Sequence, residues 1–370
     1  MLTCHTPAVI LLEVVAWAAI AVMAVLLVTQ LVGWSASVLI VSLQAITPYV
    51  LSLSAPIAVA AVATGRWPLA GAAGAAAVAL VVMSRPLRKT TVQPPVAEDA
   101  RELRVFHGNL LFYNGRTAEL ARVVAGLDAD VLAFTEYTAT HAGGLYVSPV
   151  AASFPFRIEN PDAAAGGSAM WSRYPLAEIS ATPALYRSTA AVVAFAGGVA
   201  VHVIHPPNPL EHLTDWRNEL TGLADLPDSS EQPAMVIGDF NATYWHPPFR
   251  RLGRAGWRDA HQLAGHGFSN SWPTDKAWLP PMLRLDHALV DTSLLVTGVV
   301  EVDLPGSDHR GFVVTVAVSP SAPARRGGRS RPPREATDGS STASSPRHGR
   351  PARTTSPGST AGEPSPPPGR

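Results

Sequence analysis

Several apolar, strand-like runs of this sequence end in side chains that bind metal ions or carry protons. "MVIGDFN" contains Asp239 and Asn241, and the downstream runs "LRLDHALVD" and "GSDHRGFVV" contain Asp286, Asp308 and His309. Hard oxygen ligands hold Mg²⁺, and charge-matched donors stabilise a phosphate in its transition state. These residue types at the ends of strands therefore indicate a divalent-metal site for phosphoryl chemistry.

Most of the candidate residues also have a purely structural interpretation when they are taken singly. Asn109 follows a strand, where asparagine is commonly a turn residue, and Glu136 ends another strand, where an acid is commonly just solvated. Asp239 and Asn241 could form a turn with Asx hydrogen bonds, and His205 alone is more often structural. Random turns rarely supply all of these groups together, so the combination favours a metal and proton-transfer site.

Length and composition set outer limits on the fold. The chain has 370 residues, a formal net charge of +0 and a single cysteine, Cys4. One cysteine excludes an intrachain disulfide and a cysteine-based metal site, so core packing must hold the fold, on either side of a membrane. Residues 321–370 contain nine arginines and three acids. This basic tail could contact anionic lipid or nucleic acid, and a solvated tail without a partner is at least as well supported.

Three apolar segments open the chain, over residues 8–29, 38–64 and 68–83. A spanning helix needs about 20 apolar residues, which two of the segments reach and the third nearly reaches. A buried soluble helical domain is the alternative. The near absence of charge and the short linkers favour three transmembrane helices and a multi-pass position in the cell membrane. Pro48 predicts a kink in the second helix, and Glu13 is expected at the membrane interface, with pairing inside the bundle as the alternative.

The charges beside these segments bear on orientation. Arg66 lies between the second and third segments, whereas Arg85, Arg88 and Lys89 follow the third. Counting positive charges, three against one, places the downstream domain on the cytoplasmic side.

The remainder of the chain divides by composition. We expect a membrane domain over residues 1–89, a polar linker over 90–102, a soluble domain over 103–318 and a disordered tail rich in Pro, Ser and Arg over 319–370. Strand and helix patterns alternate in the soluble domain, and Gly197-Gly198 marks a hairpin. Hairpins mixed with helices favour an α/β sandwich of mixed sheets covered by helices.

The order of these motifs resembles the endonuclease/exonuclease/phosphatase superfamily, which has the deoxyribonuclease-I-like fold. The matching marks between residues 104 and 318 are the Asn of "HGNLLFYN", the Glu of "VLAFTEYT", "SAMWSRYPL", the His of "HVIHPP", "GDFNAT", "LRLDHALV" and "GSDHRGFV". The resemblance implies a four-layer α/β sandwich, with two packed mixed sheets flanked by helices, and a metal-dependent phosphoesterase. The apolar helices are similar to those of a bacterial membrane-anchored subgroup. In that subgroup the turn that Arg66 would occupy lies on the cytoplasmic side, which implies an extracytoplasmic catalytic domain. This orientation is opposite to the one that the charge count gives.

The resemblance implies a metal site built from three positions. Asn109, Glu136 and Asp308 would form it, for Mg²⁺ or alternatively Mn²⁺, with Glu136 as a direct ligand. Asp239 would orient or deprotonate the attacking water, and Asn241 would hold that water or a phosphate oxygen.

Three further positions would contact or support the phosphate. By the same resemblance, His309 would donate to a phosphate oxygen, oriented by Asp286, and His205 would contact the phosphate from the other side. A carboxylate beside an imidazole fixes its tautomer and raises its pKa. No acid beside "MWSRYPL" is an evident partner for His205. His107 and His246 match no family position and are interpreted as packing or surface residues.

Three functions compete on this reading. The first is a membrane-anchored, Mg²⁺-dependent hydrolase of phosphate esters, most simply a phosphodiesterase. The alternatives are a catalytically silent scaffold on the same fold, and a transporter or channel subunit formed by the helices. The candidate substrates are nucleic acid, a nucleotide or a phospholipid headgroup, because the fold does not choose among them. No obligate protein partner is evident.

Overall fold

The computed structural model describes residues 7–88, 92–226 and 232–319. The chain separates into two units, Met1–Gly328 and Arg329–Arg370. The second unit and nearly all of the predicted tail lie outside the described residues.

The first unit begins with helices. They are α1 (Pro7–Val32), α2 (Val38–Ala45), α3 (Thr47–Ser52), α4 (Ser54–Ala63), α5 (Trp67–Ser84) and the short 3-10 helix η1 (Arg85–Leu87). Within the described residues, Pro7–Val32 and Trp67–Leu87 are long and apolar enough to cross a membrane. The predicted second span is broken, because Val38–Ala45 and Thr47–Ala63 meet at an angle of 64°. Three transmembrane helices are therefore not confirmed; the number is two, or three if the bent pair is one span.

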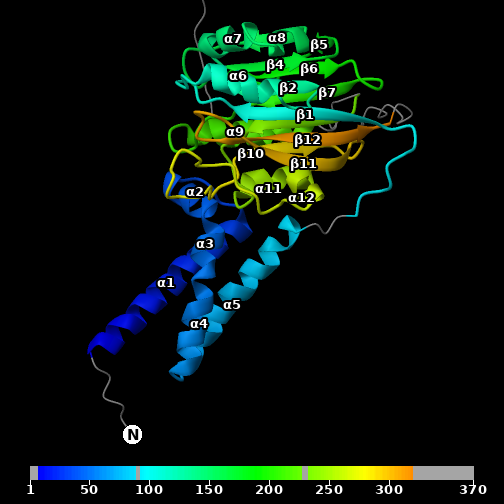
Figure 1. Ribbon diagram of the computed structural model, residues 1–370. Coiled ribbons are helices and arrows are strands. Elements are labelled where there is room, and N and C mark those ends of the chain that lie inside the picture. Colours follow the sequence, from blue (N-terminus) through cyan, green and yellow to red (C-terminus); the bar gives the residue numbers. More distant parts are fainter. Residues whose placement is uncertain (1–6, 89–91, 227–231, 320–370) are drawn as a thin grey trace, which may run out of the picture. The chain divides into compact units, whose positions relative to one another are not determined.

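The break in the second segment has a local cause. Pro48 lies in the first turn of α3, where its missing N–H is tolerated, and it could not continue α2 as an unbroken helix. Gln44 is fully buried at the end of α2. Its side chain accepts from Ser35 Oγ at 2.8 Å and donates to Trp34 O at 2.9 Å. These bonds fix α2 against the chain that follows α1 (Figure 1).

A charged pair joins two of the helices at their far end. Glu13 of α1 lies 3.0 Å from Arg66, which precedes α5. The pairing offsets the cost of placing either charge beside apolar helices.

Two six-stranded sheets follow. The first has the order β11-β12-β1-β2-β4-β3 and the second the order β5-β6-β7-β8-β10-β9. The strands are β1 (Arg101–Asn109), β2 (Val131–Thr135), β3 (Phe156–Asn160), β4 (Ser168–Ser172), β5 (Leu176–Glu178), β6 (Thr189–Val193), β7 (Val199–Ile204), β8 (Ala234–Asp239), β9 (Arg258–Asp259), β10 (Asp286–Val290), β11 (Leu295–Asp303) and β12 (Arg310–Val318). Both sheets mix parallel and antiparallel pairs.

The sheets pack face to face, and helices cover their outer faces (Figure 1). This packing follows from the alternation of side chains between the two faces of β1. Val105 belongs to the core between the sheets, whereas Phe106 packs in the cluster with the helices that cover the first sheet. Those helices are α6 (Thr117–Ala125), α7 (Ala139–Tyr146) and α8 (Val150–Ser153). On the second sheet they are α9 (Leu213–Gly222), η2 (Leu223–Asp225) and α11 (Pro247–Arg254), and α12 (Ala260–Ala264) packs at the edge of the central core. The two mixed sheets with flanking helices match the sandwich that the sequence predicts.

Candidate active site

Strand direction brings the predicted residues to one end of the sandwich. In the first sheet β1 and β2 are parallel, so Asn109 and Glu136 lie at the same end. β12 is antiparallel to β1, so Asp308 and His309, which precede it, lie there too. In the second sheet β7 and β8 are parallel, and β10 is antiparallel to β8.

The register of the second sheet completes the arrangement. Asp286, the first residue of β10, pairs directly with Asp239, the last residue of β8. His205 follows the end of β7, beside β8. Hydrogen bonds and close ionic contacts link all eight predicted residues into one network; they are Asn109, Glu136, His205, Asp239, Asn241, Asp286, Asp308 and His309.

Asn109 connects the two sheets at this end. Its amide nitrogen donates to Glu136 Oε1 and to Asp239 Oδ2, both at 3.0 Å, and its amide oxygen accepts from Leu111 N. Asn109 is fully buried, so the carboxylates on either side of it have little freedom to move. It thereby sets the spacing between the acid of the first sheet and that of the second.

Two residues of the site have an unusual backbone. Glu136 and Asn241 have φ angles of 53° and 47°, in the left-handed region. This conformation is uncommon for glutamate and is easier for asparagine. It persists because the Glu136 side chain is held by Asn109 and by Phe112 N–H, and because Asn241 N–H donates to Asp239 Oδ1 at 2.8 Å. Strain of this kind concentrates at functional sites, where neighbouring contacts over-determine the geometry.

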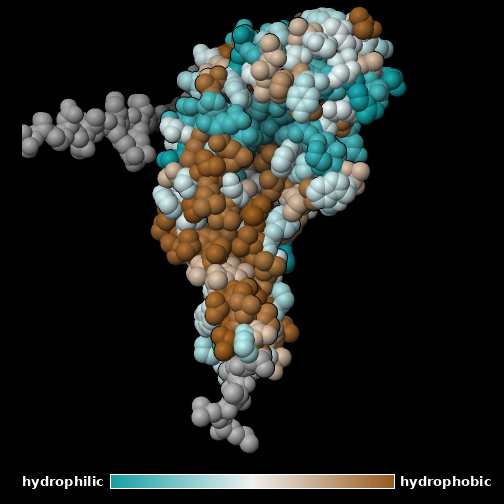
Figure 2. Space-filling model, turned by 90° about the vertical axis from the view of Figure 1, so that its left-hand side faces the viewer, coloured by the Kyte–Doolittle hydropathy of each residue, from teal (hydrophilic) through white to brown (hydrophobic). Residues whose placement is uncertain are grey.

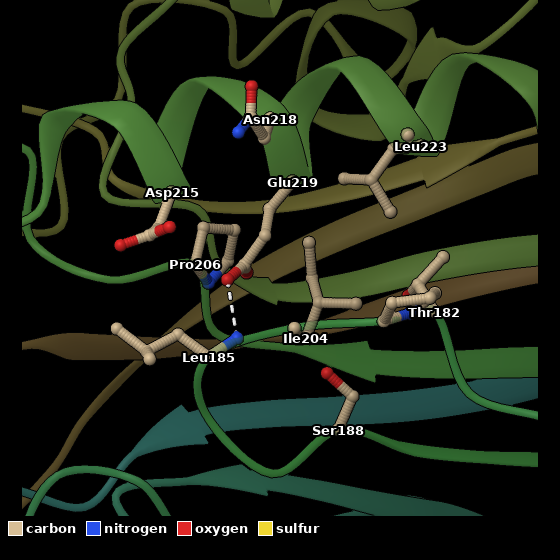
Figure 3. Close-up of a pocket in the computed structure, with 12 residues that line it drawn as sticks. Thr182, Leu185, Ser188, Ile204, Pro206, Asp215, Asn218, Glu219 and Leu223 are labelled. Atoms are coloured by element: carbon tan, nitrogen blue, oxygen red, sulfur yellow. Dashed lines mark hydrogen bonds between the residues drawn. The ribbon is translucent and has the colours of Figure 1, made fainter. Parts of the chain in front are cut away.

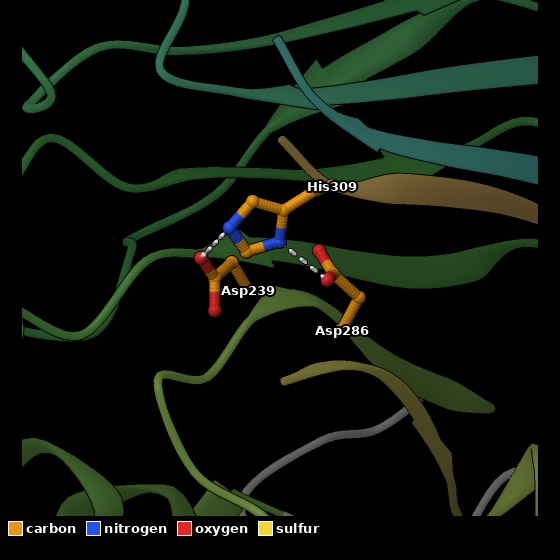
Figure 4. Close-up of side chains that lie close together, drawn as sticks. All are labelled: Asp239, Asp286 and His309. Carbon is orange, nitrogen blue, oxygen red and sulfur yellow. Dashed lines mark hydrogen bonds and ion pairs between the residues drawn. The ribbon is translucent and has the colours of Figure 1, made fainter. Parts of the chain in front are cut away.

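His309 lies between two carboxylates (Figure 4). Its Nδ1 lies 2.7 Å from Asp286 Oδ2, and its Nε2 lies 3.7 Å from Asp239 Oδ2. Burial alone would lower the pKa of His309, but Asp286 and Asp239 raise that pKa to about 10. The imidazole is therefore protonated at neutral pH, with one N–H held by Asp286 and the other directed toward Asp239.

Asp286 has a second imidazole partner. His107 Nε2 lies 2.9 Å from Asp286 Oδ1, and both side chains are fully buried. Burial would raise the pKa of Asp286, but His309 and His107 hold that pKa well below its usual range. Asp286 thus stays ionised and keeps His309 in one orientation.

Asp239, Asp286 and His309 lie close enough together to suggest a metal site, with ligand atoms within 4.8 Å of one another. Each oxygen of Asp286, however, is already bound to a histidine, His107 or His309, so this carboxylate is poorly placed to bind an ion as well. We therefore interpret this cluster as a proton-donating group rather than as the metal centre.

His205 also lies close to Asp239. Its Nε2 lies 3.6 Å from Asp239 Oδ2 and 3.3 Å from the side-chain nitrogen of Asn241, and its Nδ1 lies 3.2 Å from Ala165 O. Asp239 is thus the acid near His205 that the sequence did not reveal.

Glu136 and Asp308 are the carboxylates best suited to a divalent cation. Both line the large cavity at this end of the sandwich and are partly exposed to it. Asp308 Oδ2 accepts from Trp272 Nε1 at 2.9 Å. Asp308 Oδ1 is buried and has no hydrogen-bond partner among the described residues. A carboxylate oxygen without a hydrogen-bond donor, in a cavity that a second acid also lines, fits a hard cation such as Mg²⁺.

The cavity has a volume of about 1120 Å³. Its charged lining is mostly acidic: Glu136, Asp162, Glu211, Asp239 and Asp308 face it together with Arg187 and the protonated His309. The excess of acids would attract a cation and would repel a polyanion that arrived without one.

A smaller cavity of about 380 Å³ adjoins this one, and Leu185 lines both (Figure 3). Glu219 of α9 accepts from Leu185 N at 2.7 Å, and burial raises the pKa of Glu219 to about 7. The bond holds the loop that carries Leu185 and Arg187 along the rim of the main cavity.

Sequence reasoning missed three residues of this region. The sequence pattern indicates packing or surface roles for His107 and His246. In the structure, His107 binds Asp286, and His246 Nε2 lies 3.0 Å from Val41 O in α2. Trp272 orients Asp308. The only available signal was that His107 lies two residues before Asn109 in the same strand, and therefore on the same face.

The sequence model described as the Endonuclease/Exonuclease/phosphatase family matches residues 105–309, which is more than half of the chain. Among curated proteins, none matches the chain. Many solved structures are similar in fold.

Three of these structures illustrate the likeness. D. rerio TDP2 complexed with single strand DNA product has a TM-score of 0.48 and 17% identity, covering 58% of this chain and 98% of that one. The endonuclease/exonuclease/phosphatase from Bacteroides vulgatus has a TM-score of 0.47 and 15% identity, covering 59% and 100%. Beta toxin from Staphylococcus aureus has a TM-score of 0.42 and 17% identity, covering 59% and 99%.

Proposed function

The chain belongs to the endonuclease/exonuclease/phosphatase family of phosphoester hydrolases, and from that premise we propose that it is a membrane-anchored, Mg²⁺-dependent phosphodiesterase. The observation that carries the proposal is the joining of protonated His309, Asp239 and the Asn109–Glu136 pair at one end of the sandwich. An anionic ester, its attacking water and a cation require these complementary charges in one place.

The residues divide the hydrolysis between them. Asp239 accepts a hydrogen bond from the attacking water and draws its proton, while Asn241 holds the water or a phosphate oxygen. The water oxygen bonds to phosphorus as the ester P–O bond breaks, and the leaving oxygen takes up a proton from solvent water to become an alcohol, while Asp239 returns the proton that it took to solvent. His309 donates to a phosphate oxygen, whose negative charge grows as the water adds, and His205 contacts the phosphate.

Glu136 and Asp308 would hold the divalent cation, with Asn109 positioning Glu136. A bound Mg²⁺ or Mn²⁺ would supply charge neutralisation at the phosphate. The Asp308 oxygen without a hydrogen bond and the acidic lining of the cavity support this assignment.

Two substitutions test the proposal. Asp239→Asn and His309→Gln keep the size of each side chain but remove the charge, so each should lower kcat for bis-nitrophenyl phosphate by about 10²–10³-fold. The measurement uses the full chain in detergent, with Mg²⁺, Mn²⁺ or a chelator.

The matched controls are Asp303→Asn and His266→Gln, at exposed positions outside the cavity. They should retain the unmodified rate. Wild-type turnover in either active-site variant would contradict the mechanism. If the unmodified chain hydrolyses no substrate with either metal, the catalytically silent scaffold is favoured instead.

The proposed location is the cell membrane, with the catalytic domain on the extracytoplasmic side. The apolar α1 and α5 support anchoring. Alkaline phosphatase fused after Val318 should be active, and green fluorescent protein at the same place should be dark. The reverse pattern would assign the domain to the cytoplasm, as the count of flanking charges predicts.

A further inference from the structure

Helix α2 forms one wall of the active-site cavity. Val41, Ser42, Ala45 and Ile46 line the same cavity as Glu136, Asp239, Asp308 and His309. The helical segment is therefore not only a tether, because it supplies part of the surface that a substrate must contact.

Packing makes this wall a fixed part of the site. Val41 belongs to the apolar cluster of α9 and α11, where it is buried with Phe249 and Leu252. Its carbonyl oxygen also lies 3.0 Å from His246 Nε2, on the loop that follows Asn241.

The end of α1 is held to the same part of the catalytic domain. Arg250 Nη2 donates to Gln30 O at 3.3 Å, and Arg251 Nη2 donates to Gly33 O at 3.0 Å. Cations at the carboxyl end of a helix are favourable. Both ends of the connection between α1 and α2 are therefore bound to the domain that carries the catalytic groups.

Most of the side chains in this wall are apolar. Val41, Ala45 and Ile46 line the cavity, and so do Leu283 and Leu285. Figure 2 shows the hydrophobic surface of the helical part ending against the hydrophilic surface of the catalytic domain. A ligand in this cavity is thus exposed to apolar side chains as well as to the ionic groups of the site.

From this arrangement we propose that the substrate is a membrane phospholipid, whose phosphodiester reaches Asp239 and His309 while its apolar portion lies against α2. The inference rests on the function proposed above and specifies its substrate class. Nucleic acid fits less well, since five acids line the cavity against two cationic groups, Arg187 and the protonated His309, and these offer a polyanion few contacts. A single phosphodiester with one bound cation is compatible with that lining.

The test uses the full chain in detergent and a substitution in the wall. Ala45→Trp fills the apolar part of the cavity. It should lower kcat/KM for phospholipid in mixed micelles of phosphatidylethanolamine and phosphatidylglycerol about tenfold more than kcat/KM for water-soluble bis-nitrophenyl phosphate. Ile46→Asn, at a position already exposed, should act in the same direction without a folding defect.

Leu39→Trp is the matched control, on the same helix but outside the cavity lining and 69% exposed. It should change neither rate. Three results overturn the inference while leaving the phosphodiesterase intact: hydrolysis of bis-nitrophenyl phosphate but not of phospholipid, preference for single-stranded DNA over lipid, or equal losses on both substrates in Ala45→Trp. Hydrolysis of no substrate by the unmodified chain would instead remove the proposed function itself.

Discussion

His107 is positioned to affect the orientation of His309 through Asp286, without contacting the substrate itself. Its only side-chain hydrogen bond among the described residues goes to Asp286, which orients His309. Without that bond, one oxygen of a fully buried carboxylate loses its donor. His107 is therefore a positioning residue.

His107→Phe should lower kcat about tenfold with little change in KM, because it weakens the orientation of the phosphate donor and not the binding of the ester. His107→Gln keeps an N–H donor and should restore most of the rate. The pH profile supplies a second readout: the basic limb of kcat should move in His107→Phe and return in His107→Gln. Equal losses in both variants, with an unmoved limb, would mean that His107 only packs.

The predictability of the site depends on where each residue lies in its strand. Asp239, Asp308 and Glu136 could be predicted because each lies at the end of an apolar run, Asp239 and Glu136 after it and Asp308 before it, where a charged side chain needs an explanation. His107 lies inside a strand, and its partner Asp286 is 179 residues away, so no local pattern distinguishes it from a core histidine. Only the antiparallel pairing of β8 with β10 brings that partner to the site.

At the scale of elements, the pairing of β7 with β8 determines the position of two side chains that we propose to be catalytic. Gly238 precedes Asp239 in β8, and its backbone passes so close to β7 that an added Cβ would lie 2.0 Å from Ile204 O. The next residue after Ile204 is His205. A change at Gly238 therefore disturbs both His205 and Asp239 through the backbone.

Gly238→Ala should lower the free energy of unfolding by about 2–4 kcal/mol and also reduce activity, since the two strands must separate to admit the methyl group. Urea unfolding followed by tryptophan fluorescence measures the first effect. Gly253→Ala in α11 is the control, because its Cβ meets no described atom within 4 Å. A Gly238→Ala protein as stable as the unmodified chain would show that the strands can part at little cost.

The apolar segments show the limit of prediction from composition. Hydropathy located residues 38–64 correctly as an apolar run, and Pro48 predicted a kink there. Neither signal could reveal that α2 lies at 64° to the following helices and lines a cavity. The direction of α2 is set by contacts with distant residues such as His246 and Phe249. The two mixed sheets were predictable, since each strand carries its own periodicity.

At the scale of the whole molecule, buried histidines make stability depend on pH. Burial lowers the pKa of His141, His202 and His246 to about 4 each, from an ordinary value of 6.5. The folded protein therefore keeps these imidazoles neutral, while the unfolded chain takes up protons below about pH 6.5. Their contribution to stability is fully present above that pH and is lost as the pH falls toward about 4.

His202 offers the clearest test of this dependence, because burial is the single cause of its lowered pKa. His202→Leu keeps an apolar side chain of similar size in β7 and removes the proton-binding group. Between about pH 7 and about pH 4.5, the unmodified chain should lose about 2 kcal/mol more unfolding free energy than the variant. The exposed His266→Gln should follow the unmodified chain, since it leaves the buried histidines unchanged. Urea unfolding midpoints at several pH values measure the difference. Parallel pH curves for His202→Leu and the unmodified chain would show that water reaches this strand and solvates the charged imidazole.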